Sequence, residues 1–164
     1  MTDLIKQVLD EYNWKYAEGG GTIRVEVDGE NASWSSFIRP EGEDSFSYYA
    51  VLPVRAEPDS TDSVMRLLHG INYSMRVGSF EMAPPEEQSG SQIMFKTYGL
   101  LTEGLISGDP AEAKEIVRRV IAYNMLTMDF YAKYIIKAAC GGQVELGEIL
   151  NSGNGNENER GEEI

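Results

Sequence analysis

The sequence predicts an α+β fold with elements in the order α-β-β-β-α-β-β-α and a sheet of about five strands. Two observations support this prediction. Three segments between residues 22 and 52 alternate apolar and polar residues, which is the period of half-buried strands. Residues 59–104 then read as an amphipathic helix that runs directly into two further strand-like segments. No catalytic signature interrupts that region.

The N-terminal half is expected to form one helix and an antiparallel meander. Thr2 can cap a helix in which apolar residues recur at helical spacing, and the glycine run at 19–21 ends the segment between this helix and the first strand. Asp28-Gly29 is a typical hairpin turn, and Pro53 limits the last strand to an edge or a bend. The three expected strands cover residues 23–27, 32–39 and 46–52.

The C-terminal half is expected to contain two helices and two strands. Asp59 or Ser60 caps a second helix that stops at Gly78, and a polar turn over residues 83–90 joins the strands at 80–82 and 92–97. Asp109 as cap, followed by Pro110 at the first helical position, opens a third helix. Gly141-Gly142 closes this helix. At about 31 residues it would measure roughly 46 Å, longer than a small domain is wide.

The third helix carries more apolar surface than one packed face requires. One apolar row contains Ala113, Ile116, Val117, Val120, Met128, Tyr131 and Ile135. Tyr123, Leu126, Phe130 and Tyr134 form a second row on another flank. One row can cover the sheet, whereas the other needs the first helix, a second copy of the chain or a ligand. The expected partner or dimer interface is Tyr123, Met125, Leu126, Met128, Phe130, Tyr131 and Tyr134.

Composition indicates one domain with an acidic surface. The chain has 164 residues and a formal net charge of −13. We expect a single domain over residues 1–142 and an acidic, low-complexity tail over 143–164 that reads as disordered when taken alone. Such a surface disfavours nucleic acid and anionic membranes as partners. The N-terminus lacks a continuous apolar core, so we expect a cytoplasmic protein with no export signal.

The chain offers few residues for chemistry, and we expect no enzyme activity, cofactor or metal. Cys140 and His69 are the only residues of their types, which excludes a disulfide framework and Cys- or His-based metal clusters. Helical phase indicates a solvated His69, and the small neighbours of Cys140 indicate a packed residue. The glycine run at 19–21 lacks the residues of a phosphate loop, and clustered carboxylates such as Glu41 and Glu43 indicate a solvated loop. Asn124, amid apolar rows, is expected to fix a helix-to-sheet contact or a register across a dimer.

Several scattered residues resemble those of the YbjN-like family. They are Asn72, Gly78 and Phe80, then Ile93, Phe95 and Thr97, then residues 124–129 and Gly141. The resemblance covers about residues 2–142 and implies the fold of the type III secretion chaperones, with helices packed on a twisted antiparallel sheet. It also implies a protein that is often dimeric, without known enzymatic activity, and with a regulatory or binding role.

The sequence supports two functional hypotheses from different classes. The first is a non-enzymatic, chaperone-like or regulatory homodimer that binds a polypeptide through its sheet face or third helix, for example by strand addition at a sheet edge. The second is a small-molecule sensor or enzyme with a pocket between sheet and helices, lined by Trp34, Tyr48, Tyr49 and Tyr98.

Overall fold

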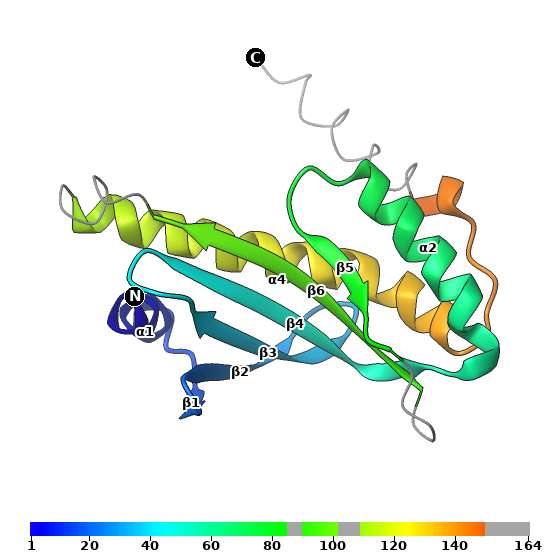
Figure 1. Ribbon diagram of the computed structural model, residues 1–164, viewed down its shortest axis with the longest axis horizontal. Coiled ribbons are helices and arrows are strands. Elements are labelled where there is room, and N and C mark those ends of the chain that lie inside the picture. Colours follow the sequence, from blue (N-terminus) through cyan, green and yellow to red (C-terminus); the bar gives the residue numbers. More distant parts are fainter. Residues whose placement is uncertain (85–89, 102–108, 150–164) are drawn as a thin grey trace, which may run out of the picture.

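The computed structural model describes residues 1–84, 90–101 and 109–149. Within them the chain forms one six-stranded antiparallel sheet in the order β1-β2-β3-β4-β6-β5, with helices packed on it (Figure 1). The predicted α+β class is therefore confirmed. The long helices are α1 (Thr2–Glu11), α2 (Thr61–Ser74) and α4 (Pro110–Ala139), and a short 3-10 helix, η1 (Pro58–Ser60), precedes α2. The strands are β1 (Tyr16–Gly19), β2 (Thr22–Asp28), β3 (Ser33–Pro40), β4 (Ser45–Ala56), β5 (Ser79–Met82) and β6 (Ser91–Leu100).

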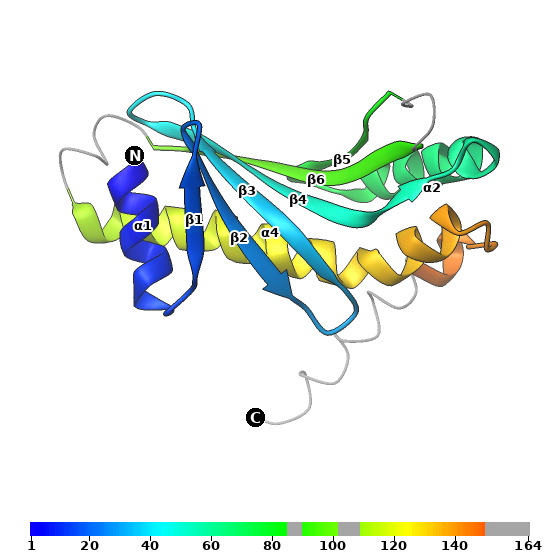
Figure 2. The ribbon, with the colours of Figure 1, turned by 90° about the horizontal axis from the view of Figure 1, so that it is seen from below.

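The molecule has two layers, a sheet and a layer of helices that shares one hydrophobic core with it. Helix α4 runs along the long dimension of the molecule, with α1 near its N-terminal end and α2 near its C-terminal end (Figures 1 and 2). Its 30 residues correspond to about 45 Å. The helix begins as predicted, because the Asp109 side chain accepts a hydrogen bond of 2.8 Å from the backbone N–H of Ala111.

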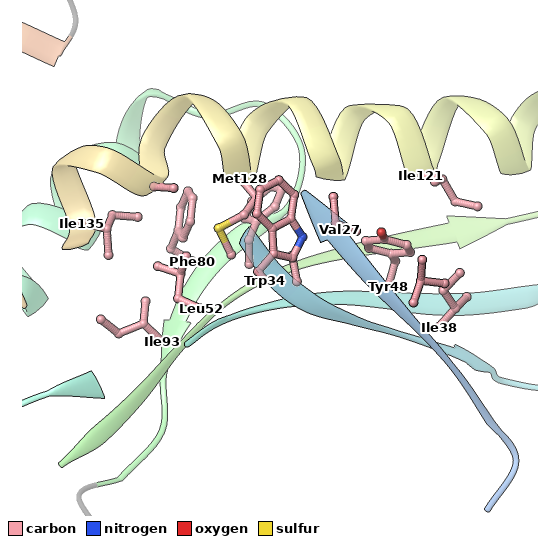
Figure 3. Close-up of a cluster of buried hydrophobic side chains, with 14 of the residues drawn as sticks. Val27, Trp34, Ile38, Tyr48, Leu52, Phe80, Ile93, Ile121, Met128 and Ile135 are labelled. Carbon is pink, nitrogen blue, oxygen red and sulfur yellow. The ribbon is translucent and has the colours of Figure 1, made fainter. Parts of the chain in front are cut away.

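Alternation along the strands builds the inner face of the sheet. In β2 the buried residues are Ile23, Val25 and Val27, while the residues between them are exposed or half-buried. Large side chains from β2, β3 and β4 point toward α4, among them Trp34 and Tyr48, and Met128 of α4 meets them from the other layer (Figure 3). The core therefore lies between the sheet and α4, and the other face of the sheet is left open.

One strand was missing from the sequence prediction. Residues 16–19 form β1, which pairs with β2 through a hairpin whose turn residues Gly20 and Gly21 have φ of 58° and 76°. Both angles are typical of a type I′ turn, which glycine adopts without steric cost. The segment Tyr-Ala-Glu-Gly has no apolar alternation, so periodicity could not identify it. The sheet consequently has six strands rather than five.

Other element boundaries differ locally from the prediction. Helix α2 ends at Ser74 instead of Gly78, and the predicted N-cap of α1 is wrong because Thr2 is already helical. Ser60 is the N-cap of α2, but its hydroxyl donates to the Ala139 carbonyl (2.9 Å) instead of capping the helix. Strand β4 continues beyond Pro53, through an irregularity between Val51 and Arg55. Of the predicted turn over 83–90, residues 85–89 lie outside the described residues.

Asn124 sets how α4 sits on the sheet. It is wholly buried, and its Nδ2 donates to the Tyr48 carbonyl of β4 (3.2 Å) and the Thr97 hydroxyl of β6 (3.0 Å), with the Phe95 carbonyl at 3.5 Å. The expected helix-to-sheet contact is confirmed. The alternative, a register across a dimer, is wrong because Asn124 is enclosed by its own chain. The Oδ1 of Asn124 is buried without a hydrogen-bond partner among the described residues, so the contacts of Nδ2 are what favour this rotational setting of the helix.

This setting defines the apolar stripe that α4 presents to the sheet. Its buried residues are Ala113, Val117, Ile121, Asn124, Met128, Ala132, Ile135, Ala138 and Ala139. The predicted row was right for Ala113, Val117, Met128 and Ile135. It omitted Ile121 and Ala132, and it included Ile116, Val120 and Tyr131, which are only half-buried.

The segment after α4 returns to the core. Ile149 is buried, and Val144 and Leu146 pack against the same cluster. Leu146 lies over Gly70 of α2, where an added Cβ would come within 2.6 Å of Leu146 Cδ2. A glycine at position 70 therefore admits this close approach. The boundary placed at residue 142 stays a prediction, and residues 150–164 of the expected tail lie outside the described residues.

We expect Asn124→Ala to lower the free energy of unfolding by about 1–3 kcal/mol, because it removes a buried donor from the carbonyl and hydroxyl partners it serves. Urea unfolding followed by circular dichroism measures this. Thr127→Ala is the matched control, since Thr127 is half-buried on the same helix, and it should change stability by less than about 0.5 kcal/mol. Equal effects of the two substitutions would contradict the assigned role of Asn124.

A second prediction concerns alkaline stability. Burial raises the pKa of Tyr48 to about 12, although the nearby Ser36 hydroxyl acts in the opposite direction. The folded state therefore keeps the phenol protonated after the unfolded state has begun to ionise near about pH 10. The contribution of Tyr48 to the free energy of unfolding is fully present below about pH 10 and is lost as the pH rises toward about 12. The loss for this group is about 2–3 kcal/mol.

Tyr48→Phe should remove this loss, because phenylalanine does not titrate. The measurement is the free energy of unfolding of wild type and variant across that pH range. If the two proteins lose stability in parallel, Tyr48 is not the group responsible.

Candidate functional site

The outer face of α4 is the side turned away from the sheet, and we define it by Ala122, Tyr123, Leu126 and Phe130. Helical geometry places Leu126 on the opposite side of the helix from Asn124. Leu126 is 73% exposed and Tyr123 is 37% exposed. One side of α4 is thus fully packed, while apolar side chains on its other side are left in solvent. Contiguous exposed apolar residues are a feature of interaction sites.

Two hollows lie on either side of Leu126. The α1–α4 hollow has a volume of about 280 Å³ and is lined by Val8, Leu9, Tyr12, Trp14, Arg118, Ile121, Ala122, Met125 and Leu126. The α2–β5 hollow is wider, at about 770 Å³, and is lined by residues 74–77 together with Tyr123, Leu126, Thr127, Phe130 and Tyr131. Leu126 lines both hollows. It therefore forms a ridge between two depressions on one surface.

An ionic cluster joins α1 to α4 beside the first hollow. Glu11 accepts from Lys114 Nζ (2.9 Å) and from Arg118, and Arg119 Nε contacts Glu115 at 2.9 Å. The hydrogen bonds from Lys114 and Arg118 hold the pKa of Glu11 below its ordinary value. Glu11 in turn raises the pKa of Arg118. The ion pairs of Glu11 with Lys114 and Arg118 hold α1 against α4 at the wall of the hollow.

Aromatic contacts support the other end of the outer face. Tyr123 donates its hydroxyl hydrogen to the Val77 carbonyl (3.1 Å), which ties α4 to the connection between α2 and β5. Tyr131 packs edge-on against Phe80 (ring centroids 5.6 Å) and against Phe130 (4.9 Å). Burial raises the pKa of Tyr131. Tyr131 thus belongs partly to the core, whereas Phe130 lines the α2–β5 hollow.

The residues of the predicted interface differ in how far they are exposed. Tyr123 and Leu126 are exposed, and Met125, Phe130, Tyr131 and Tyr134 are half-buried. Met128 is wrong as an interface residue, because it is fully buried in the stripe that faces the sheet. Tyr12, Trp14 and Val77 join the surface from other elements. Sequence reasoning missed them because only the three-dimensional packing brings them beside α4.

The alternative pocket predicted from four aromatic residues is wrong. Trp34 and Tyr48 are buried on the inner face, at 3% and 0% exposure, while Tyr49 and Tyr98 lie on the open face. On that open face the cross-strand pairs Arg24–Phe37 and Tyr49–Lys96 bring a cation over each ring, at 5.9 Å and 5.3 Å. Such pairs are ordinary stabilising contacts of an exposed sheet.

The two residues considered for chemistry are both exposed. His69 is solvated as predicted, whereas the prediction of a packed Cys140 is wrong, because Ala138 and Ala139 are buried and Cys140 faces solvent. In the part of the chain that the structure describes, no three His, Cys, Asp or Glu residues gather in a way that could hold a metal ion. None of the described helices combines the length and apolar character needed to cross a bilayer.

One sheet edge is closed by a side chain. Asn72 of α2 donates from Nδ2 to the Phe80 carbonyl (2.9 Å), and its Oδ1 accepts from the Phe80 N–H (2.8 Å). The amide thereby occupies both backbone groups that Phe80 directs away from β6. Because β5 spans only Ser79–Met82, this leaves little free edge for an added strand.

The family of the protein is established by comparison with known sequences. The family described as YbjN, "Putative bacterial sensory transduction regulator", matches residues 2–123, which is more than half of the chain. The chain belongs to the YbjN family. The match ends inside α4, so Leu126 and Phe130 lie beyond the matched segment. No curated protein matches this YbjN family member.

A solved structure shows the same fold. It is titled "Crystal structure of YbjN, a putative transcription regulator from E. coli", and it is similar to this chain with a TM-score of 0.50 and 13% sequence identity. The similarity covers 75% of this chain and 93% of that chain. At this identity the comparison supports the fold alone. The expected likeness to type III secretion chaperones stays a prediction.

We expect Asn72→Ala to open the β5 edge and to lower stability by about 1–2 kcal/mol, since two hydrogen bonds to Phe80 are lost. Hydrogen exchange should show faster exchange of the Phe80 amide than in wild type. Asn72→Asp tests the two bonds separately, because it keeps an acceptor for the Phe80 N–H but sets a carboxylate oxygen against the Phe80 carbonyl, so the protection should lie between that of wild type and that of Asn72→Ala. Unchanged Phe80 exchange in the alanine variant would show that Asn72 does not close this edge.

Proposed function

We propose that this YbjN family member is a non-enzymatic regulatory protein that binds polypeptides and forms a homodimer through the outer face of α4. The single observation behind this proposal is Leu126, which is 73% exposed between two hollows. The family description, "Putative bacterial sensory transduction regulator", supports a regulatory role. The similar E. coli protein is titled "a putative transcription regulator", which is consistent with that role.

The shape of the outer face suits a second copy of itself. A two-fold dimer interface uses the same patch on both subunits, so the patch must contain both protrusions and depressions. Leu126 is the protrusion, and the α1–α4 hollow beside it is an apolar depression lined by Tyr12, Trp14 and Met125. A two-fold axis close to Leu126 would place each Leu126 in the partner's hollow. Burying a leucine in this way contributes about 1.5–3 kcal/mol.

The placement of the two residues considered for chemistry favours binding over catalysis. Cys140 and His69 lie on different elements, and both face solvent. An activated nucleophile needs a base within hydrogen-bond reach, and the base in turn needs a group that orients it. The acidic composition supports polypeptide partners over nucleic acid, because a net charge of −13 repels a phosphate backbone.

Leu126→Glu should weaken dimerisation by at least about tenfold, because it places a charge where an apolar contact is buried. Sedimentation equilibrium over a range of concentrations measures the dissociation constant, and circular dichroism checks that the variant stays folded.

Tyr98→Glu is the matched control. Tyr98 is 49% exposed on the open face of the sheet, far from the proposed interface in the fold. It should dimerise like wild type. A wild-type protein that remains monomeric at high concentration, or equal weakening by both substitutions, would contradict the proposal.

A further inference from the structure

Strand β1 covers only part of the edge of β2. The last pair between them is Tyr16 with Val25, whereas β2 continues to Asp28. Glu26, Val27 and Asp28 pair with β3 on one side, and none of the described strands pairs with them on the other. The edge of the sheet is therefore open at the C-terminal end of β2.

The chain before β1 turns away instead of extending along this edge. Asn13 has a φ of 54°, a left-handed conformation that asparagine tolerates better than most residues. The N–H groups of Asn13 and Trp14 bond to the Asp10 and Leu9 carbonyls, so this segment closes the end of α1. A hollow of about 580 Å³ results, which we call the β2-edge slot. It is lined by Asn13, Trp14, Lys15, Val25, Glu26, Val27, Asp28 and Met125.

The slot has an apolar side and a charged rim formed by Lys15, Glu26 and Asp28. Trp14 and Met125 form its apolar side, and both also line the α1–α4 hollow, so the two depressions are neighbours. Asp28 is exposed and makes no ion pair in the part of the chain that the structure describes, whereas Glu26 is paired with Arg24 at 2.6 Å. Lys15 also lines the slot, so the rim holds one cation beside the unpaired carboxylate of Asp28, in a protein that is acidic as a whole.

The opposite edge of the sheet, at β5, is less suited to strand addition than the β2 edge. At β5 the Asn72 side chain occupies the backbone of Phe80. At residues 26–28 none of the described side chains bonds to the backbone, and the apolar floor lies directly beside the edge. Strand addition takes affinity from backbone hydrogen bonds and specificity from pockets for alternate side chains. The β2-edge slot provides both.

We infer that the β2-edge slot receives a short extended segment of another polypeptide. The segment pairs with the open edge of β2, places one large apolar side chain against Trp14 and Met125, and sets a lysine or arginine beside Asp28. This inference rests on the proposed polypeptide-binding role but uses a surface different from the ridge at Leu126.

Selection of a phage-displayed library of random heptapeptides on the full chain tests the inference. Wild type should enrich sequences that alternate apolar residues with lysine or arginine. Selected peptides, made synthetically, should bind at least about tenfold more weakly to Asp28→Lys, since an attractive charge becomes repulsive. A proline that removes a backbone N–H from the peptide should also weaken binding. The Leu126→Glu variant should bind the selected peptides as tightly as wild type does.

The outcomes separate this inference from the proposed dimer. Asp28→Lys should retain the sedimentation behaviour of wild type, because the ridge at Leu126 is unchanged. No enrichment over an uncoated surface, acidic or non-alternating selected sequences, or equal binding by Asp28→Lys would overturn the slot while leaving the dimer standing. Peptides that bind wild type but lose affinity only with Leu126→Glu would show that the outer face of α4 is the peptide site instead.

Discussion

The contact between Asn124 and strands β4 and β6 determines which side of α4 packs on the sheet and which side faces solvent. A helix with apolar residues on several sides could settle on a sheet in more than one rotational setting. The buried amide reaches the Tyr48 carbonyl and the Thr97 hydroxyl in the observed setting. A small rotation that kept Asn124 in the core would separate its Nδ2 from these acceptors, at a cost of about 1–3 kcal/mol. The consequence on the far side of the helix is that Leu126 faces solvent.

The same contact explains why the two proposed binding surfaces are neighbours. Once α4 is fixed, Met125 lies toward α1 and β2, next to Trp14, and Leu126 lies outward. The ionic cluster around Glu11 then holds α1 against the first part of α4. Trp14 and Met125 line both depressions. This arrangement suits a regulatory protein, because association with a second copy and with a polypeptide would involve adjoining residues.

Much of the fold could be predicted from local patterns, whereas the site could be predicted only in part: Tyr123, Leu126 and Phe130 were named in advance, and the residues from other elements were not. Strand alternation, the Asp109-Pro110 helix start and the isolated Asn124 all reflect short-range chemistry that the sequence displays directly. Strand β1 was missed because Tyr16–Gly19 has no alternation, and its only signal is the glycine turn after it. Met128 was misassigned because helical periodicity shows that rows exist without showing which row faces the sheet. The role of Trp14 depends on the packing of α1 against α4, which no local pattern encodes.

The most direct test of this account is carbene footprinting of the full chain over a range of protein concentrations, read at single residues by mass spectrometry. The account predicts that Leu126 and Tyr123 are labelled at low concentration and become protected as concentration rises, while Tyr98 is labelled equally throughout and Met128 stays unlabelled. Labelling of Met128 in the folded protein would contradict the setting of α4. Labelling of Leu126 that does not change with concentration would contradict association through the outer face.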